Sequence, residues 1–232
     1  MLGAGSFLDR LTPLLGAVLV GFLLTTLLHE FLHAYVAYLG GDRSEYNRLQ
    51  LRDPLTYLDP LTSVVFPLVF VLLGGLPLMG GSVMIRRDLI RSDRWRVAMD
   101  LAGVVGNFAV FVVCGLLLTY FPWDSGSQTQ ENIRLFLGAL AFLQLFCVLL
   151  NLTPVPGFDG FHALTNFLPP HQREAMFNPQ ARLLGMIIFF VILWNTEFAS
   201  MVYFPLMGSI CGLLQIDHLA MVLAFQSVLF GV

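Results

Sequence analysis

Residues 28–33 read Leu-His-Glu-Phe-Leu-His and lie inside a stretch that is otherwise apolar. On a helix, positions i and i+4 share one face, so His29 and His33 can present two imidazoles to one metal ion. The spacing His-Glu-x-x-His is typical of zinc sites in which the glutamate, here Glu30, acts as a general base. The alternative to a metal site is that the two histidines are structural residues of a helix near a membrane boundary, with their hydrogen bonds satisfied locally. Three ionisable side chains within five residues are costly in lipid, however, which indicates a partner or a chemical role.

The composition is that of an integral membrane protein. Of the 232 residues, 57% are hydrophobic and 12% are charged, whereas a soluble domain carries about 25% charged residues. The net charge is −3, and no basic segment indicates a nucleic-acid partner. The lipid bilayer is therefore the expected partner, and nothing in the sequence specifies an oligomeric state. The three cysteines lie in apolar runs without a Cys-x-x-Cys spacing, so no disulfide is expected.

Long apolar runs predict an all-α polytopic membrane protein with about five to six transmembrane helices. Such runs lie at 11–28, 101–123 and 135–150, and the run at 11–28 continues through the histidine motif to about Leu39 and stops at Gly40-Gly41. Because this first run carries the motif, we do not expect it to be a cleaved signal peptide.

The C-terminal region 183–232 is long enough for two membrane-spanning helices, with a break near Glu197 or Pro205. No long polar segment predicts a separate soluble domain. We therefore expect one membrane-embedded domain over residues 1–232, with a core at about 11–168 and C-terminal helices at 182–232.

Two segments after the first helix do not fit a regular spanning helix. Residues 46–57 alternate apolar and polar side chains around Leu49 and Leu51, which predicts a small β-hairpin at the membrane edge. An irregular polar loop is the alternative. Residues 60–85 are uncharged but repeatedly interrupted by proline and glycine, so we expect a re-entrant or broken element. The arginine-rich segment 86–96 predicts a solvated loop.

A catalytic zinc ion usually takes three protein ligands and leaves a fourth position for water. The side chains that could complete the histidine pair are Asp42, Asp59, Asp100, Asp159, His162, His171 and His218. Asp159 is favoured because it follows a span on a segment kinked by prolines and glycines, where an unpaired charge would be costly. It could instead cap a short helix at 161–168, and His162 is a rival ligand.

The segment 151–160 reads Asn-Leu-Thr-Pro-Val-Pro-Gly-Phe-Asp-Gly. Together with the His29–His33 motif, it resembles the site-2 protease family of intramembrane zinc metalloproteases. The likeness covers about residues 20–165 and includes segments 47–60 and 102–107. No segment resembles a PDZ or CBS domain, so the chain is similar to the minimal membrane core of that family.

The sequence departs from the family pattern at a few positions. Val104 and Gly157 stand where many relatives have proline, and Phe161-His162 replaces the common Gly-Arg after Asp-Gly. None of these positions is an expected ligand, but His162 leaves the surroundings of the metal open.

The resemblance implies a zinc metalloendopeptidase that cleaves membrane proteins within or near their transmembrane segments, as in regulated intramembrane proteolysis. It implies one Zn²⁺ per chain, held by His29, His33 and Asp159. It further implies that Glu30 is the general base and that the substrate strand or the oxyanion is bound by Asn151 and Asn107. The alternative is a non-proteolytic membrane protein with a structural or transported zinc ion.

Charge gives an independent expectation for topology. If Asp159 joins the histidines, the spans that precede these ligands must end on the same side, so residues 60–85 make no net crossing. One side of the membrane then carries ten arginines, namely Arg43, Arg48, Arg52, Arg86, Arg87, Arg91, Arg94, Arg96, Arg173 and Arg182. The other side carries Arg10 and Arg134. The positive-inside rule therefore predicts an outside N-terminus and an active site nearer the cytoplasmic face of a prokaryotic plasma membrane.

Overall fold

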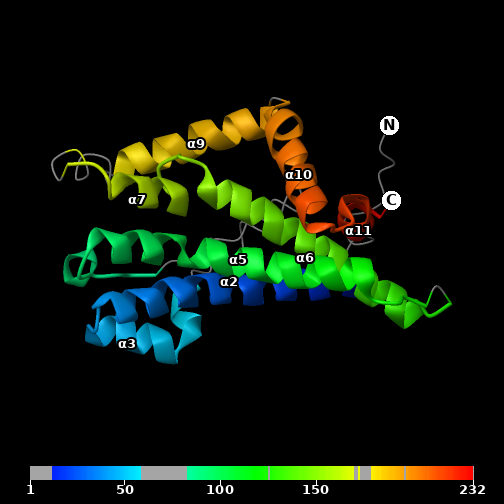
Figure 1. The fold of residues 1–232 in the computed structure, drawn as a ribbon, viewed down its shortest axis with the longest axis horizontal. Coiled ribbons are helices and arrows are strands. Elements are labelled where there is room, and N and C mark those ends of the chain that lie inside the picture. The colour runs from blue at the N-terminus through cyan, green and yellow to red at the C-terminus, as the bar shows by residue number, and fades with distance from the viewer. Residues whose placement is uncertain are drawn as a thin grey trace.

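The computed structural model describes residues 12–58, 83–124, 126–169, 172, 179–195 and 197–231. Within these ranges all regular structure is helical, and no strand occurs (Figure 1). The predicted all-α class is therefore confirmed for the described part of the chain.

Three of the described helices are long and apolar enough to cross a membrane: α2 (Pro13–Gly40), α5 (Asp93–Tyr120) and α6 (Gln128–Leu152). Each begins at a hydroxyl side chain that accepts a hydrogen bond from a backbone N–H of the first turn. These N-cap residues are Thr12, Ser92 and Ser127. The cap at Ser92 explains why α5 starts ahead of the predicted apolar run and includes part of the expected loop 86–96.

The three long helices pack antiparallel to their neighbours in sequence. Gly40, at the end of α2, lies against Trp95 in the first turn of α5. Gly138, early in α6, lies near Leu118, late in α5. The C-terminal ends of α2 and α6 therefore face the same end of the bundle, as the predicted ligand set requires. In Figure 1, α6 lies between α5 and the C-terminal helices α9 (Pro179–Asn195) and α10 (Phe204–Leu214).

The β-hairpin predicted for residues 46–57 is wrong. This segment forms helix α3 (Glu45–Arg52) and a 3₁₀ helix, η1 (Pro54–Tyr57). Ser44 caps α3, an acidic residue lies in its first turn and a basic residue in its last turn, which all favour a helix.

Burial explains why the alternation misled the prediction. The face of α3 that packs inward is polar and carries Asn47 and Gln50, which are three residues apart. The amide of Asn47 donates to the carbonyl oxygens of Ala34 (3.2 Å) and Asp42 (2.9 Å). Leu49, by contrast, is 52% exposed, so the apolar alternation does not mark a buried strand face.

The chain returns to the end of α2 after α3. The backbone of Met84 exchanges two hydrogen bonds with the side-chain amide of Gln50 (2.9 and 3.5 Å). The N–H of Arg91, just after the 3₁₀ helix η3 (Arg87–Leu89), donates to the carbonyl oxygen of Gly40 (3.0 Å). Of the re-entrant element predicted at 60–85, residues 60–82 lie outside the described residues, and residues 83–85 have no regular secondary structure.

The C-terminal region is divided more finely than expected. It contains α9, a π-helical turn η4 (Ala199–Tyr203) that runs into α10, and α11 (His218–Phe230). The predicted break near Glu197 is confirmed, whereas Pro205 lies in the first turn of α10, where proline is tolerated. A second break at 215–217 separates α10 from α11. Each of these helices is shorter than 18 residues.

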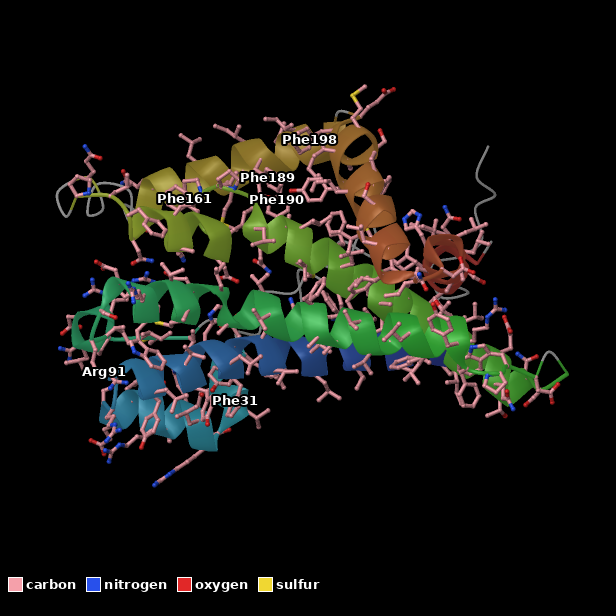
Figure 2. All side chains as sticks on the ribbon, viewed as in Figure 1. Phe31, Arg91, Phe161, Phe189, Phe190 and Phe198 are labelled. Atoms are coloured by element: carbon pink, nitrogen blue, oxygen red, sulfur yellow. The ribbon has the colours of Figure 1, made fainter. Side chains whose placement is uncertain are left out.

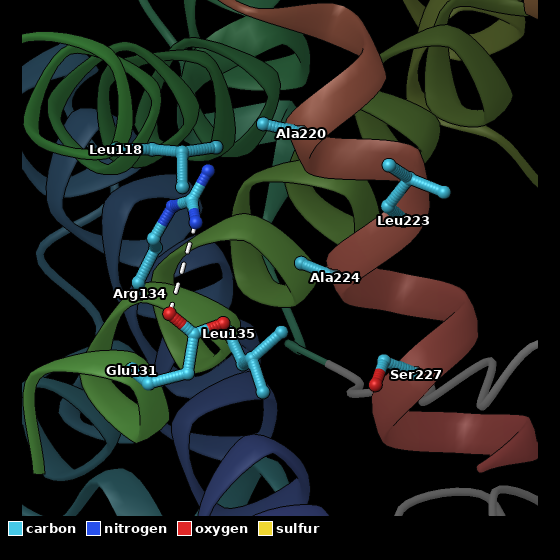
Figure 3. A pocket seen from close by; sticks show the side chains of 8 residues that line it. All are labelled: Leu118, Glu131, Arg134, Leu135, Ala220, Leu223, Ala224 and Ser227. Atoms are coloured by element: carbon cyan, nitrogen blue, oxygen red, sulfur yellow. Dashed lines mark ion pairs between the residues drawn. The ribbon is translucent and has the colours of Figure 1, made fainter. Parts of the chain in front are cut away.

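A cavity of about 260 Å³ lies between α5, α6 and α11, far from the histidine motif (Figure 3). Its lining is mainly apolar, and Arg134 forms an ion pair with Glu131 beside it (3.7 Å). The two opposite charges of this pair balance each other at the edge of the cavity.

Single-cysteine labelling tests the topology. Exposed positions Tyr46 and Asp88 should react with an impermeant thiol reagent from the same side of the membrane, because both flank the end of α2. Asp124, between α5 and α6, should react from the opposite side. The background would be a variant with alanine at the three native cysteines. Labelling of positions 46 and 88 from opposite sides would contradict this arrangement.

Candidate metal centre

His29 and His33 lie one turn apart on α2, and both are buried. Their Nε2 atoms are 3.0 Å apart. Nδ1 of His33 lies 2.6 Å from the carbonyl oxygen of Met99 on α5. Since that oxygen can only accept, Nδ1 carries the proton, and the lone pair of Nε2 is free to bind a cation. Nδ1 of His29 has no such partner among the described residues.

Asp159 brings a carboxylate to the same point from a distant part of the chain. It is the first residue of the short helix α7 (Asp159–Thr165), directly after the N-cap residue Phe158. Its Oδ2 atom lies 3.2 Å from Nε2 of His29 and 3.4 Å from Nε2 of His33. Its side chain therefore faces the imidazoles and does not cap the helix, which was the alternative.

This arrangement fits a zinc ion. The three ligand atoms lie within 4.8 Å of one another. Tetrahedral zinc with bonds of about 2.0–2.1 Å places its ligand atoms about 3.3 Å apart. Oδ2 of Asp159 is also buried without a hydrogen bond from any described residue. Such an atom is costly to bury unless a partner, here a cation, satisfies it.

Gly103 on α5 allows this helix to cover the imidazoles. A Cβ atom at this position would lie 2.5 Å from ring atoms of both His29 and His33, closer than real side chains approach. Only glycine permits this approach without displacing the rings. In the sequence, Gly103 stands out only as part of the segment that resembles the family. No residue pattern predicts that the carbonyl oxygen of Met99 accepts a hydrogen bond from His33.

The loop before Asp159 is held by the C-terminal helices. Phe158 packs edge-on against Phe189 and Phe190, on the side of α9 that faces α6 (5.3 and 6.2 Å between ring centroids; Figure 2). The hydroxyl of Thr153 lies 2.5 Å from that of Tyr203. These contacts fix the kinked segment that the prolines and glycines allow.

The other candidate ligands lie elsewhere. Both carboxylate oxygens of Asp42 accept backbone hydrogen bonds, from Ser44 (3.1 Å) and Arg86 (2.9 Å). Asp100 pairs with Arg87. His162 on α7 and His218 at the start of α11 are not part of the three-residue group. Asp59 and His171 lie outside the described residues.

The remaining predicted site residues lie on the elements that build the centre. Glu30 is buried beside His29 on α2. Burial, and to a lesser extent the charge of Glu30, raises the pKa of Tyr57 to about 12, so the two groups are within electrostatic reach. Asn107 is buried one turn after Gly103 on α5. Asn151 is half-buried in the last turn of α6.

Comparison with known proteins yields relatives named as metalloproteases. "Putative zinc metalloprotease Rip2" of Mycolicibacterium smegmatis is 34% identical over 191 residues, which cover 80% of this chain and 71% of the relative. The protein of the same name from Mycobacterium tuberculosis is 33% identical over 189 residues, with the same coverage. "Putative zinc metalloprotease YwhC" of Bacillus subtilis is 27% identical over 209 residues, which cover 88% of this chain and 91% of the relative.

No protein-family profile matches the chain, and no solved structure matches it. The relatives nevertheless align over most of both sequences at an identity that establishes common descent, and they are members of one family. The chain belongs to the site-2 protease family.

Proposed function

We propose that the protein is an intramembrane zinc metalloprotease that hydrolyses peptide bonds within or near transmembrane segments of membrane proteins. The observation that carries this proposal is the convergence of His29, His33 and Asp159 within 4.8 Å, beside the buried Glu30 and among apolar helices. The printed names of the relatives support a zinc-dependent protease.

His29, His33 and Asp159 would hold the zinc ion, which supplies a Lewis acid that acidifies water and polarises a peptide carbonyl. Glu30 takes one proton from the attacking water as the hydroxyl group adds to the carbonyl carbon. Glu30 then delivers this proton to the amide nitrogen as the carbon–nitrogen bond breaks, which yields a carboxyl and an amine terminus. The bond between His33 and Met99 keeps the imidazole oriented during these steps.

A transmembrane substrate must unwind before attack, because its carbonyl groups are engaged in helical hydrogen bonds. An edge strand at 46–57 would have been a natural dock for the unwound segment, but α3 is a helix and offers no such edge. We assign substrate binding to the amides of Asn107 and Asn151 instead. These residues lie on α5 and α6, the two helices that adjoin the centre.

We further propose that the site lies nearer the cytoplasmic face of a bacterial plasma membrane. The arginine distribution supports this orientation, and the relatives come from bacteria. The return of the chain to the end of α2, through the bond from Arg91 to Gly40, supports the assignment of the arginine-rich segments to one side.

The substitution Glu30→Gln tests proteolysis. Without a group that accepts the proton, cleavage should fall by about 10²–10⁴-fold, while one zinc ion per chain remains bound. Cleavage of single-span peptides by purified protein in lipid vesicles, together with a metal assay, would measure both. Glu45→Gln, which makes the same change at an exposed position on α3, should leave both unchanged. Cleavage retained by Glu30→Gln would contradict the role of Glu30. Zinc binding without cleavage in the wild type would favour a structural or transported zinc ion.

The substitution Gly103→Ala tests the covering of the imidazoles by α5. The added methyl group would displace one or both rings, so we expect zinc affinity to weaken by about 10- to 100-fold. Gly16→Ala is the matched control, because nothing lies within 4 Å of a Cβ atom there. Competition with a chromophoric chelator measures the affinity. Equal affinities in the two variants would show that α5 does not constrain the ligands.

A further inference from the structure

Consecutive residues of α5 hold the two segments that carry the ligands. The carbonyl oxygen of Met99 accepts a hydrogen bond from the imidazole of His33 (2.6 Å). The next residue, Asp100, accepts a hydrogen bond from the side-chain amide of Asn166 (2.7 Å). Asn166 is the C-cap residue of α7, the helix that begins with Asp159. One turn of α5 thus contacts both the histidine helix and the aspartate helix.

The second contact is a buried, charge-assisted cluster. The guanidinium of Arg87 donates two hydrogen bonds to the two carboxylate oxygens of Asp100 (2.6 and 2.7 Å). It also lies within 3.5 Å of the amide oxygen of Asn166. The side chain of Asp100 is only 3% exposed, so its charge depends on this partner. The paired, planar geometry fixes the orientation of the carboxylate that Asn166 contacts.

Asn166 also closes α7. Its amide nitrogen, besides contacting Asp100, lies within hydrogen-bond distance of the carbonyl oxygens of His162 (3.0 Å) and Ala163 (3.3 Å), which also accept from the hydroxyl of Thr165 and the backbone N–H of Asn166. The same side chain therefore ends α7 and fastens it to α5.

We propose that Arg87, Asp100 and Asn166 form a clamp that positions Asp159 for metal binding. α7 has seven residues and is only about 10 Å long. At its other end, a Cβ atom on Gly160 would lie 2.6 Å from the carbonyl oxygen of Leu152, so the end of α6 blocks movement there. A helix held at this point tilts if its far end is released. Metal–ligand distances tolerate only about 0.2 Å, so a small tilt removes the Asp159 carboxylate from the ion. The inference rests on the proposed zinc site and not on proteolysis.

The substitution Asn166→Asp tests the clamp. It replaces the amide donor by a second carboxylate that faces Asp100, so α7 should separate from α5. We expect zinc affinity to weaken at least about tenfold. X-ray absorption should show two imidazoles still bound to zinc and the carboxylate lost. The double variant Asp100→Asn with Asn166→Asp exchanges donor and acceptor, restores one amide–carboxylate bond beside Arg87, and should recover both readouts.

Two controls separate positioning from general stability. Asn132→Asp makes the same chemical change at an exposed site at the start of α6 and should leave zinc binding unchanged. Gly138→Ala places a methyl group 2.5 Å from Cβ of Ala224 and should lower the melting temperature without altering zinc affinity. If Asn166→Asp does not fold, Asn166→Ala removes the same contact without adding charge and takes its place.

Zinc affinity within twofold of the wild type, with the carboxylate still bound, would overturn the clamp. So would a loss of affinity in Gly138→Ala equal to that in Asn166→Asp, since the effect would then follow stability alone. These readouts do not involve cleavage. A wild-type protein that binds zinc through three ligands but cleaves nothing would contradict the proposed protease and leave the clamp intact.

Discussion

A carboxylate whose Oδ2 atom is buried beside two imidazoles, among helices that are otherwise apolar, is the constraint on which the structure depends. A charge in such surroundings is unfavourable unless opposite charge or a cation balances it. Asp159 meets this condition only because α7 brings it within 3.4 Å of both Nε2 atoms. The C-terminal ends of α2 and α6 must therefore lie at one side of the bundle, and the chain must kink after α6 to deliver the carboxylate.

The helix α5 is the scaffold against which this centre is assembled. It supplies no ligand, yet it orients His33 through a carbonyl group, admits both rings through the missing side chain of Gly103, and fastens the end of α7. These three functions fall within about one and a half turns of the helix. A scaffold of this kind can hold ligands from sequence-distant segments without contributing charge to the metal.

The sequence allowed prediction of the three long apolar helices and of the grouping of His29 with His33, because hydropathy over a long run and the spacing of the two histidines are local signals. Asp159 could be predicted as a candidate ligand because a charge on a kinked segment directly after a span is unusual. Other features depend on tertiary contacts. The polar face of α3 packs inward, so Leu49 is exposed and does not mark a buried strand face. Asp100, which the sequence left open as a possible metal ligand, binds Arg87 and Asn166. Hydrogen bonds to backbone carbonyl groups, such as that of Met99, cannot be predicted from the type of the residue that carries the carbonyl.

The separation of His33 from Asp159 along the chain has a consequence for biosynthesis. Helix α2, with its two imidazoles, emerges from the ribosome long before α7 does. A site of two histidines without the carboxylate would bind zinc weakly. The centre is complete only once the segment after α6 has been translated and has docked. A nascent chain that ends before Asp159 therefore lacks the complete three-residue group, and the proposed protease would be inactive while it is still being inserted into the membrane.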